Sequence, residues 1–516
     1  MVQESRTTKS IKNAQVNVIY YLIQIVLGFW SRKVFYDYLG SEILGLDTTA
    51  QSLLQFLNIA ESGVGAAVAY FLYSPFFNND KEKIIKIVAI QGYIYKRIAN
   101  LILVLAVVVM LFFPWIFSDI NIPLWYAYVT FSVLLFGNLL GYYVNYKQSV
   151  LAADQKTYKV TRVTQLTSIL FKVFLIFYLP YSSYPFYLYV STTLLGSIIG
   201  SIWLNKVIKD EYPWLDLSNK NGRILIREFP EVLKKTKQLF VHKVAGYIVF
   251  YCSPLIMYSF STLTIIAYYG NYLAITNNIK ILLTQAFSST SAAIGNLVAS
   301  NDSKRMISVF WELIDSRMCI STIIIFVLSI VTEPFITVWL SSKYLLGKDI
   351  LFLILLNMWL FINRSTIDAF KDGFGIYQDI WAPFAEGTIN LLVSIVAGTF
   401  WGIGGVLLGG IFSYIIVVYI WKPYYLFKVG FNIDSINGFF VPYIKRIILS
   451  VVSFMILYYI VSVIKLNIIN YYDVFYWSIL LLLISTVYFY VGFFIFTNGM
   501  KLFHNRIMEM IKNKIQ

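Results

Sequence analysis

Apolar runs long enough to cross a bilayer recur along almost the whole chain, and this feature most constrains the fold. A membrane-spanning helix needs about 20 apolar residues. The runs are continuous and do not alternate in polarity, so they predict helices and not the strands of a membrane barrel. Hydrophobic residues make up 59% of the 516 positions and charged residues only 13%, which excludes a soluble globular protein. We predict about fourteen spanning helices, at 16–36, 44–72, 88–114, 122–146, 160–180, 184–206, 238–262, 266–298, 306–340, 349–370, 377–399, 402–427, 438–464 and 471–497.

Lysine and arginine gather in alternate connections between the predicted spans. If the N-terminus is cytoplasmic, thirty of the 41 basic residues lie in the cytoplasmic connections and tails, Lys371 and Lys422 among them, and five lie on the opposite side. This bias follows the positive-inside rule and predicts that both termini are cytoplasmic. The net charge of +15 mostly reflects the same distribution, so no nucleic-acid partner is expected.

Few residues of the chain could carry catalysis or hold a metal. Its two histidines, His242 and His504, and its two cysteines, Cys252 and Cys319, have neither metal-ligand nor disulfide spacing. No G-x-x-x-x-G-K-[ST] loop for nucleotide phosphates is present. The outer connections are short, which leaves little room for the chemistry of an integral polymerase or glycosyltransferase. We expect a protein that is not an enzyme and has no cofactor and no metal.

The two halves of the chain share one pattern. The stretches "ESGVGAAVAYFLYSPFFNNDKEKIIKIV" and "SSTSAAIGNLVASNDSKRMISVFWEL" each place small residues before a polar turn and a new apolar run. Six predicted spans precede the longest cytoplasmic loop, so both copies start on the same side of the membrane and the repeat is parallel. Many transporters have two such lobes, with a substrate path between them near the midplane.

The predicted fold is therefore an all-α polytopic membrane protein with two six-helix lobes, related by a pseudo-twofold axis along the membrane normal, plus two C-terminal helices. We place the N-terminal lobe at 1–208, a basic cytoplasmic loop at 209–236, the C-terminal lobe at 237–430, and the two extra helices with a cytoplasmic tail at 431–516.

Several ordered motifs resemble those of one transporter family. They are "AAIGNLVASND", "WLSSKYLLGKDI", "RSTIDAFKDGFGIYQDIWAPFAEGTINLLVSIVAGTFWGIGGVLLGGIFS" and the N-terminal "SRKVFYDYLGSEILGLDTTAQSLLQFLNIAESGVGAAVAYFLYSP". Together they are similar to the polysaccharide-transport branch of the multidrug/oligosaccharidyl-lipid/polysaccharide exporter superfamily, the Wzx-like flippases. The likeness covers roughly residues 10–430.

The resemblance implies a function. Such a protein moves an undecaprenyl-diphosphate-linked oligosaccharide, the repeat unit of an O-antigen, capsule or exopolysaccharide, from the inner to the outer leaflet by alternating access. It implies a bacterial inner membrane, and a polymerase and glycosyltransferases of the same pathway as possible partners. Two alternatives remain: an ion-coupled exporter of amphipathic small molecules with the same fold, and an integral polymerase or glycosyltransferase, which the short outer loops disfavour.

A lipid-linked diphosphate needs a wet, cationic cavity, so basic residues at membrane depth are the candidate contacts. A charged residue at the centre of a spanning helix costs about 2.5–3.5 kcal/mol on insertion scales, so each should face the protein interior or a partner. Arg364 fits a phosphate best, because a guanidinium can donate two parallel hydrogen bonds. The candidates for this cavity are Lys280, Arg364, Arg317, Lys172 and, at the outer mouth, Arg32, with Lys96 and Arg97 nearer the cytoplasmic edge.

Each charge also has a purely structural interpretation. Arg364 and Asp368 are four residues apart on one helical face and could neutralise each other. Arg317 could do the same with Glu312 or Asp315 in its own helix, whereas Lys280 and Lys172 have no acid at these spacings. The candidates for ion coupling or gating are Glu61, Asp368 and Glu386, with Asp379 as a further gate or helix-end contact.

Overall fold

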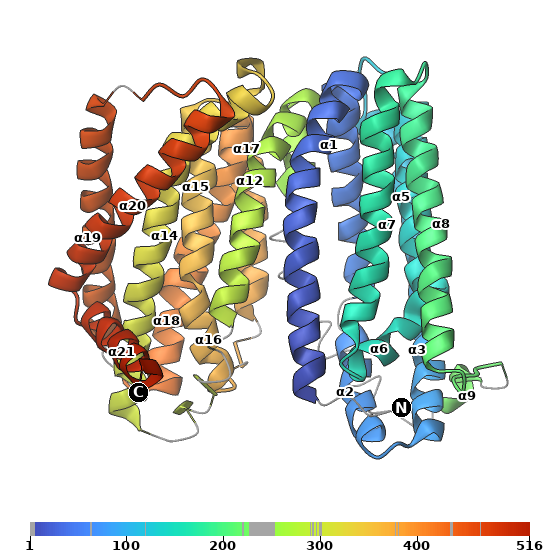
Figure 1. Ribbon diagram of the computed structural model, residues 1–516, viewed down its shortest axis with the longest axis horizontal. Helices are drawn as coiled ribbons and strands as arrows, with labels where there is room; N and C mark the ends of the chain where they lie inside the picture. Colours follow the sequence, from blue (N-terminus) through green and yellow to red (C-terminus); the bar gives the residue numbers. More distant parts are fainter. Residues whose placement is uncertain are drawn as a thin grey trace. The chain divides into compact units, whose positions relative to one another are not determined.

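The computed structural model describes residues 6–61, 64–118, 120–218, 221–226, 253–288, 290, 294–295, 297–298, 302–376, 378–379, 381–433, 437–464 and 466–515. All regular structure in these residues is helical (Figure 1), which confirms the predicted all-α fold. His242, Cys252, the Ala292–Ala293 pair and, in the 209–236 loop, residues 219–220 and 227–236 lie outside the described residues.

Nine helices of the described residues are long and apolar enough to cross a membrane, and a tenth candidate is a pair of helices bent by 55°. The nine are Gln15–Leu57, Lys81–Leu111, Thr157–Tyr181, Pro185–Glu211, Ser303–Trp339, Lys348–Gly373, Trp381–Gly430, Asn437–Val463 and Tyr471–Phe496. The chain is thus a multi-pass membrane protein, and the number of fourteen spans stays a prediction.

Two of these nine helices contain a break and are long enough for two crossings. The helical stretch Trp381–Gly430 has 50 residues, a length of about 75 Å against a hydrocarbon core of about 30 Å. Within it, Gly402 has φ 55° and ψ −132°, a conformation that side-chain-bearing residues rarely adopt. Gly40 interrupts the first helix in the same way, with φ 82°. These breaks match the predicted connections between spans near positions 40 and 400.

Residues Met1–Ala267 form one compact unit. In it α1, α5, α7 and α8 pack side by side (Figure 1), and Leu46, Val68, Ile90 and Phe131 lie in its hydrophobic core. Its elements are α1 (Arg6–Leu57), η1 (Asn58–Glu61), α2 (Val64–Phe77), α3 (Lys81–Leu111), α4 (Phe113–Ile116), α5 (Trp125–Tyr143), α6 (Gln148–Ala153), α7 (Thr157–Tyr178), α8 (Pro185–Glu211), α9 (Gly222–Leu225), α11 (Ser253–Ser259) and the first turn of α12 (Leu263–Ser288).

Residues Tyr268–Gln516 form the second compact unit. Its core is aromatic: the rings of Phe370, Phe427, Phe431 and Phe439 surround Phe310 at centroid distances of 5.3–6.2 Å. Its elements are the rest of α12, α14 (Ser303–Trp339), α15 (Lys348–Asn363), α16 (Ser365–Gly373), α17 (Trp381–Ser413), the π-helical segments η5 (Tyr414–Trp421) and η6 (Leu426–Gly430), α18 (Lys422–Tyr425), α19 (Asn437–Val463), α20 (Tyr471–Phe496) and α21 (Asn498–Ile515). Two compact units agree with two lobes, and the lobe boundaries proposed above stay a prediction.

Glycine allows the two halves of α17 to pack closely on either side of the break. A Cβ added at Gly405 would overlap the backbone of Ala397, and one at Gly409 would overlap Ser394. The "GIGGVLLGG" stretch thus forms one side of a tight helical hairpin, the kind of close approach that small residues permit in membranes. The chain therefore reverses direction near Gly402. As a result, Glu386 near the start of α17 lies beside Lys422, which comes after the end of α17.

Candidate functional site

Arg364 is the one residue between α15 and α16, which together form the apolar stretch Lys348–Gly373. Its guanidinium donates through Nε to Asp368 Oδ2 at 2.8 Å, the i,i+4 pair that the sequence suggested. A second bond runs from Nη1 to Glu386 Oε1 on α17 at 2.7 Å. Arg364 therefore holds two carboxylates, one local and one 22 residues away in the chain.

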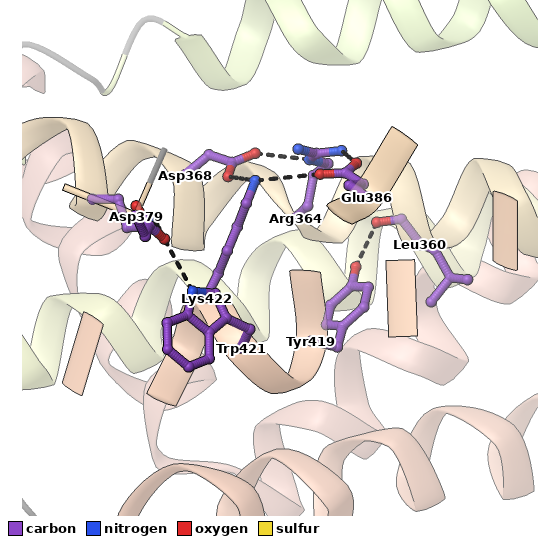
Figure 2. Close-up of polar contacts among 9 residues, drawn as sticks. Leu360, Arg364, Asp368, Asp379, Glu386, Tyr419, Trp421 and Lys422 are labelled. Atoms are coloured by element: carbon purple, nitrogen blue, oxygen red, sulfur yellow. Dashed lines mark hydrogen bonds and ion pairs between the residues drawn. The ribbon is translucent and has the colours of Figure 1, made fainter. Parts of the chain in front are cut away.

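Lys422 completes a cluster of four charges. Its ammonium donates to Asp368 Oδ1 at 2.9 Å and lies 3.8 Å from Glu386 Oε2 (Figure 2). We call Arg364, Asp368, Glu386 and Lys422 the four-charge cluster; its two cations and two anions give no net charge. Asp368 is the most accessible member, with 34% of its side chain exposed, against 6% for Glu386. The remaining two side chains are also largely buried.

Lys422 and Lys371 both lie in buried ion pairs. The sequence assigned both to cytoplasmic connections, which stays a prediction, and the structure shows that the side chains of both are largely buried in the protein. Lys371 donates to Asp379 Oδ2 at 2.6 Å, and the indole of Trp421 donates to the same oxygen at 3.2 Å. A signal for the role of Lys422 was available in the sequence. The charges of Arg364, Asp368 and Glu386 sum to −1, so if these three side chains are buried together, a second cation is needed to neutralise them.

The backbone around Lys422 is unusual. Tyr414–Trp421 is π-helical, a rare geometry that is found often at functional sites. Within it, Tyr419 donates to the carbonyl of Leu360 at 2.5 Å, and the ring of Tyr414 lies 5.5 Å from the Arg364 guanidinium (Figure 2 shows the Tyr419 contact). The π-helical segment thus fixes Lys422 and two tyrosines against α15 and its junction with α16.

Arg317 does not pair with Glu312 or Asp315, and that part of its structural interpretation is wrong. Its Nη1 donates to Ser365 Oγ at 3.0 Å and to Thr366 Oγ1 at 3.2 Å, on the turn that follows Arg364. Its Nη2 reaches the end of α12, donating to the carbonyl of Phe287 at 3.2 Å and to Thr290 Oγ1 at 2.7 Å. All these partners are neutral oxygens.

The two acids on α14 instead bind the C-terminal helices. Arg506 of α21 donates to Glu312 Oε2 at 2.8 Å. Arg446 of α19 makes a bidentate pair with Asp315, whose side chain is fully buried. Because these acids are used elsewhere, they do not neutralise Arg317.

Lys280 lies in the last third of α12, at 5.3 Å from the ring of Phe361. Among the described residues its ammonium has no carboxylate within ion-pair distance and no hydrogen-bond partner. The helix α12 itself is not one of the nine apolar candidates. Asn271, Asn277 and Asn278 interrupt its apolar sequence.

The first unit places its predicted residues separately. Lys172 on α7 donates to Gln24 Oε1 at 2.6 Å. Arg32 donates to the carbonyl of Ala267 at 2.9 Å. Glu61 accepts a bond from the hydroxyl of Tyr95 at 2.7 Å. The described side chains thus bring Arg317 and Arg364 together, through the turn at Ser365, and leave these three in contacts of their own.

Sequence reasoning missed one half-buried acid of the first unit. Asp47 accepts from the Tyr189 hydroxyl at 2.7 Å and from the Gln51 amide at 2.7 Å. It is the first acid within the predicted 44–72 span, so its position in an apolar run was the available signal.

Comparison with known proteins identifies the fold. No family model and no curated protein sequence matches the chain. Among solved structures it is similar to the lipid II flippase MurJ in an inward closed conformation, with a TM-score of 0.65 and 17% identity over 92% of this chain and 98% of that one. It is also similar to an inward-facing multidrug resistance MATE family transporter of the MOP superfamily, with a TM-score of 0.60 and 13% identity over 80% of this chain and 97% of that one. The chain therefore has the polytopic helical fold of these membrane transporters, as the sequence predicted.

Proposed function

We propose that the protein is a flippase that moves a lipid-linked oligosaccharide with a diphosphate headgroup from the inner to the outer leaflet by alternating access. One observation carries the proposal: Lys280 and Arg317 are cations of the second unit that no carboxylate of the described residues neutralises. Arg317 is buried and Lys280 is half-buried, and a charge within a membrane-spanning bundle that lacks a counter-ion is a functional candidate by default. An anionic substrate would supply the missing charge.

The four-charge cluster suits a different role. Its charges already cancel, so it attracts a diphosphate less than a free cation does. Arg364 stays a predicted substrate contact, because its guanidinium could exchange a carboxylate for a phosphate oxygen during transport. Asp368 and Glu386, which it holds, stay candidates for gating or ion coupling, as does Glu61. In the first unit, Lys172 and Arg32 donate to neutral oxygens and remain candidate contacts for the same substrate.

The substrate class rests on the resemblance and is supported by the fold. The solved structure similar to this chain over 92% of its length is a flippase of lipid II. Together with the sequence motifs, this favours an undecaprenyl-diphosphate-linked repeat unit of an O-antigen, capsule or exopolysaccharide. We infer that the protein acts between the glycosyltransferases that build the unit and the polymerase that joins units, without catalysing either step.

One observation favours an exporter of amphipathic cations as the second candidate. Such a protein would use an acid in the transport path, and the half-buried Asp47, which accepts from the Tyr189 hydroxyl and the Gln51 amide, is the candidate in the first unit. Export of a cationic dye by the intact protein, lost in Asp47→Asn, would support that candidate. We expect dye export to be unchanged when the protein is removed.

Removal of the protein from its native cells tests the proposal. Lipid-linked oligosaccharide repeat units should then accumulate as single units in the inner leaflet, because a diphosphate and its sugars do not cross hydrocarbon unaided. The leaflet is read with an oligosaccharide-binding lectin that cannot cross the membrane, before and after the cells are opened. Single units in the outer leaflet would instead indicate a polymerisation defect and contradict the flippase.

The proposed direction of transport requires that both termini be cytoplasmic, in a bacterial inner membrane. The helix α8 gives a test, because Ser183 just before it and Asp210 in its last turn are both exposed. In a variant with Cys252 and Cys319 replaced by serine, Ser183→Cys should react with an impermeant thiol reagent in intact cells. Asp210→Cys should react only after the cells are opened, and the reverse pattern would invert the proposed orientation.

A further inference from the structure

A large groove lies between α19 and α20, with a volume of about 1300 Å³. The two helices are antiparallel, so the start of α19 and the end of α20 lie at the same end of the unit, where α21 follows (Figure 1). The groove begins at this end, beside Pro442 and Thr497, and runs inward to Ile456 and Leu483.

The length of the groove fits one leaflet. From Pro442 to Ile456 the helix rises about 21 Å at 1.5 Å per residue. Half of a bilayer, including its headgroup region, is about 20–22 Å thick. A groove that starts at the end of two spanning helices and stops after this distance therefore extends from the headgroup region to about the bilayer centre.

The walls and the end of the groove differ in chemistry. Ile448 and Val452 on α19, with Leu483 and Val487 on α20, are exposed apolar side chains that line it. Lys445 lines the end of the groove beside α21 and is also exposed. The groove thus has an apolar slot and a cationic end, as an anionic lipid with an acyl chain requires.

Lys445 carries the free positive charge at this end. Its neighbour Arg446 also lines the groove, but it is committed to Asp315 and lies 4.3 Å from the ring of Trp311. Among the described residues, Lys445 has neither an ion pair nor a hydrogen bond. Near a membrane surface, one lysine attracts an anionic headgroup measurably.

We propose that this groove is a binding site for an anionic phospholipid of the leaflet that contains the α21 end of the unit. The headgroup phosphate pairs with Lys445, and one acyl chain lies between α19 and α20. The site is separate from Lys280, Arg317 and the four-charge cluster, and it stands whether or not the protein is a flippase. A lipid bound in the groove would lie next to Arg446, whose ion pair with Asp315 connects α19 to α14.

Two substitutions separate the headgroup contact from the acyl slot. Lys445→Gln removes the charge and keeps a side chain of similar length. Gly492→Leu fills the slot, and a Cβ added at Gly492 meets no atom within 4 Å, so this variant should fold. Gly141 on α5 is matched to it, because a Cβ there also meets no atom within 4 Å and the position is in the other unit.

The full-length protein, purified in detergent, is titrated with phosphatidylglycerol or with phosphatidylcholine carrying the same acyl chains, and bound lipid is counted by native mass spectrometry. The wild type should retain phosphatidylglycerol more tightly. Lys445→Gln should weaken that binding about fivefold, Gly492→Leu should lose it, and Gly141→Leu should match the wild type. Equal retention of the two lipids, or binding unchanged by both groove variants, would overturn the site. If undecaprenyl diphosphate displaces phosphatidylglycerol and is itself lost in Gly492→Leu, the groove serves the polyprenyl lipid and the proposal is wrong.

Discussion

Arg364→Gln is expected to remove most of the folded protein from the membrane, and adding Glu386→Gln is expected to restore it. The single substitution leaves Asp368 and Glu386 facing Lys422 alone, with one buried carboxylate in excess. Breaking a buried ion pair from one side costs about 3–5 kcal/mol, while removing both partners is often close to neutral. The double variant keeps the Lys422–Asp368 bond of 2.9 Å intact. Abundance is measured by size-exclusion chromatography of a fluorescent fusion.

A second double variant serves as the matched control. Arg364→Gln with Asp368→Asn also removes one charge of each sign, but it leaves Lys422 with Glu386 at 3.8 Å, beyond hydrogen-bond distance. It should therefore restore less protein than the Glu386→Gln combination. Equal rescue by the two, or a stable Arg364→Gln single variant, would contradict the cluster. If the restored variant is abundant and yet inactive, Arg364 contacts the substrate as well as its acids.

Lys280→Gln is expected to abolish most transport without reducing the amount of protein. No carboxylate is stranded when this charge is removed, so the folded state loses no ion pair among the described residues. A hydrogen bond between charged groups contributes about 1.5–3 kcal/mol, so its loss should reduce transport about ten- to hundredfold. Initial rates are measured in vesicles, normalised to the amount of protein inserted.

Two variants control for effects that are not specific to the lysine charge. Lys280→Arg keeps the charge and should retain part of the activity. Phe361→Leu removes the ring under the ammonium but no charge, and it should have a small effect if the lysine serves the substrate. Full transport by Lys280→Gln would remove Lys280 from the site and leave Arg317 as the leading cation.

The fold was predictable because its determinants are local. Apolar runs of the length of a bilayer define spanning helices wherever they occur, and glycines at 40 and 402 mark two of the connections. The pair of Arg364 and Asp368 was predictable for the same reason, because four residues on a helix are neighbours. Each of these inferences needed only a short window of sequence.

The rest of the site depends on contacts that no short window contains. Glu386 is 22 residues from Arg364, and Lys422 is 54 residues from Asp368. The positive-inside rule assigns a lysine near the end of a span to one side of the membrane, and it does not identify the acids with which Lys422 pairs. The local pairing considered for Arg317 is not made, because distant arginines of α19 and α21 hold both nearby acids.

Translocation by the purified protein tests the central claim most directly. Vesicles with the wild type, with Lys280→Gln and without protein are loaded with undecaprenyl-diphosphate-linked oligosaccharide in the inner leaflet. They are compared under a proton gradient, a sodium gradient and no gradient. An external glycosidase then reports the fraction of oligosaccharide that has reached the outer leaflet. We predict fast exposure only with the wild type, under at least one of these conditions. Exposure by the wild type no faster than in protein-free vesicles, under all three conditions, would contradict the proposed function.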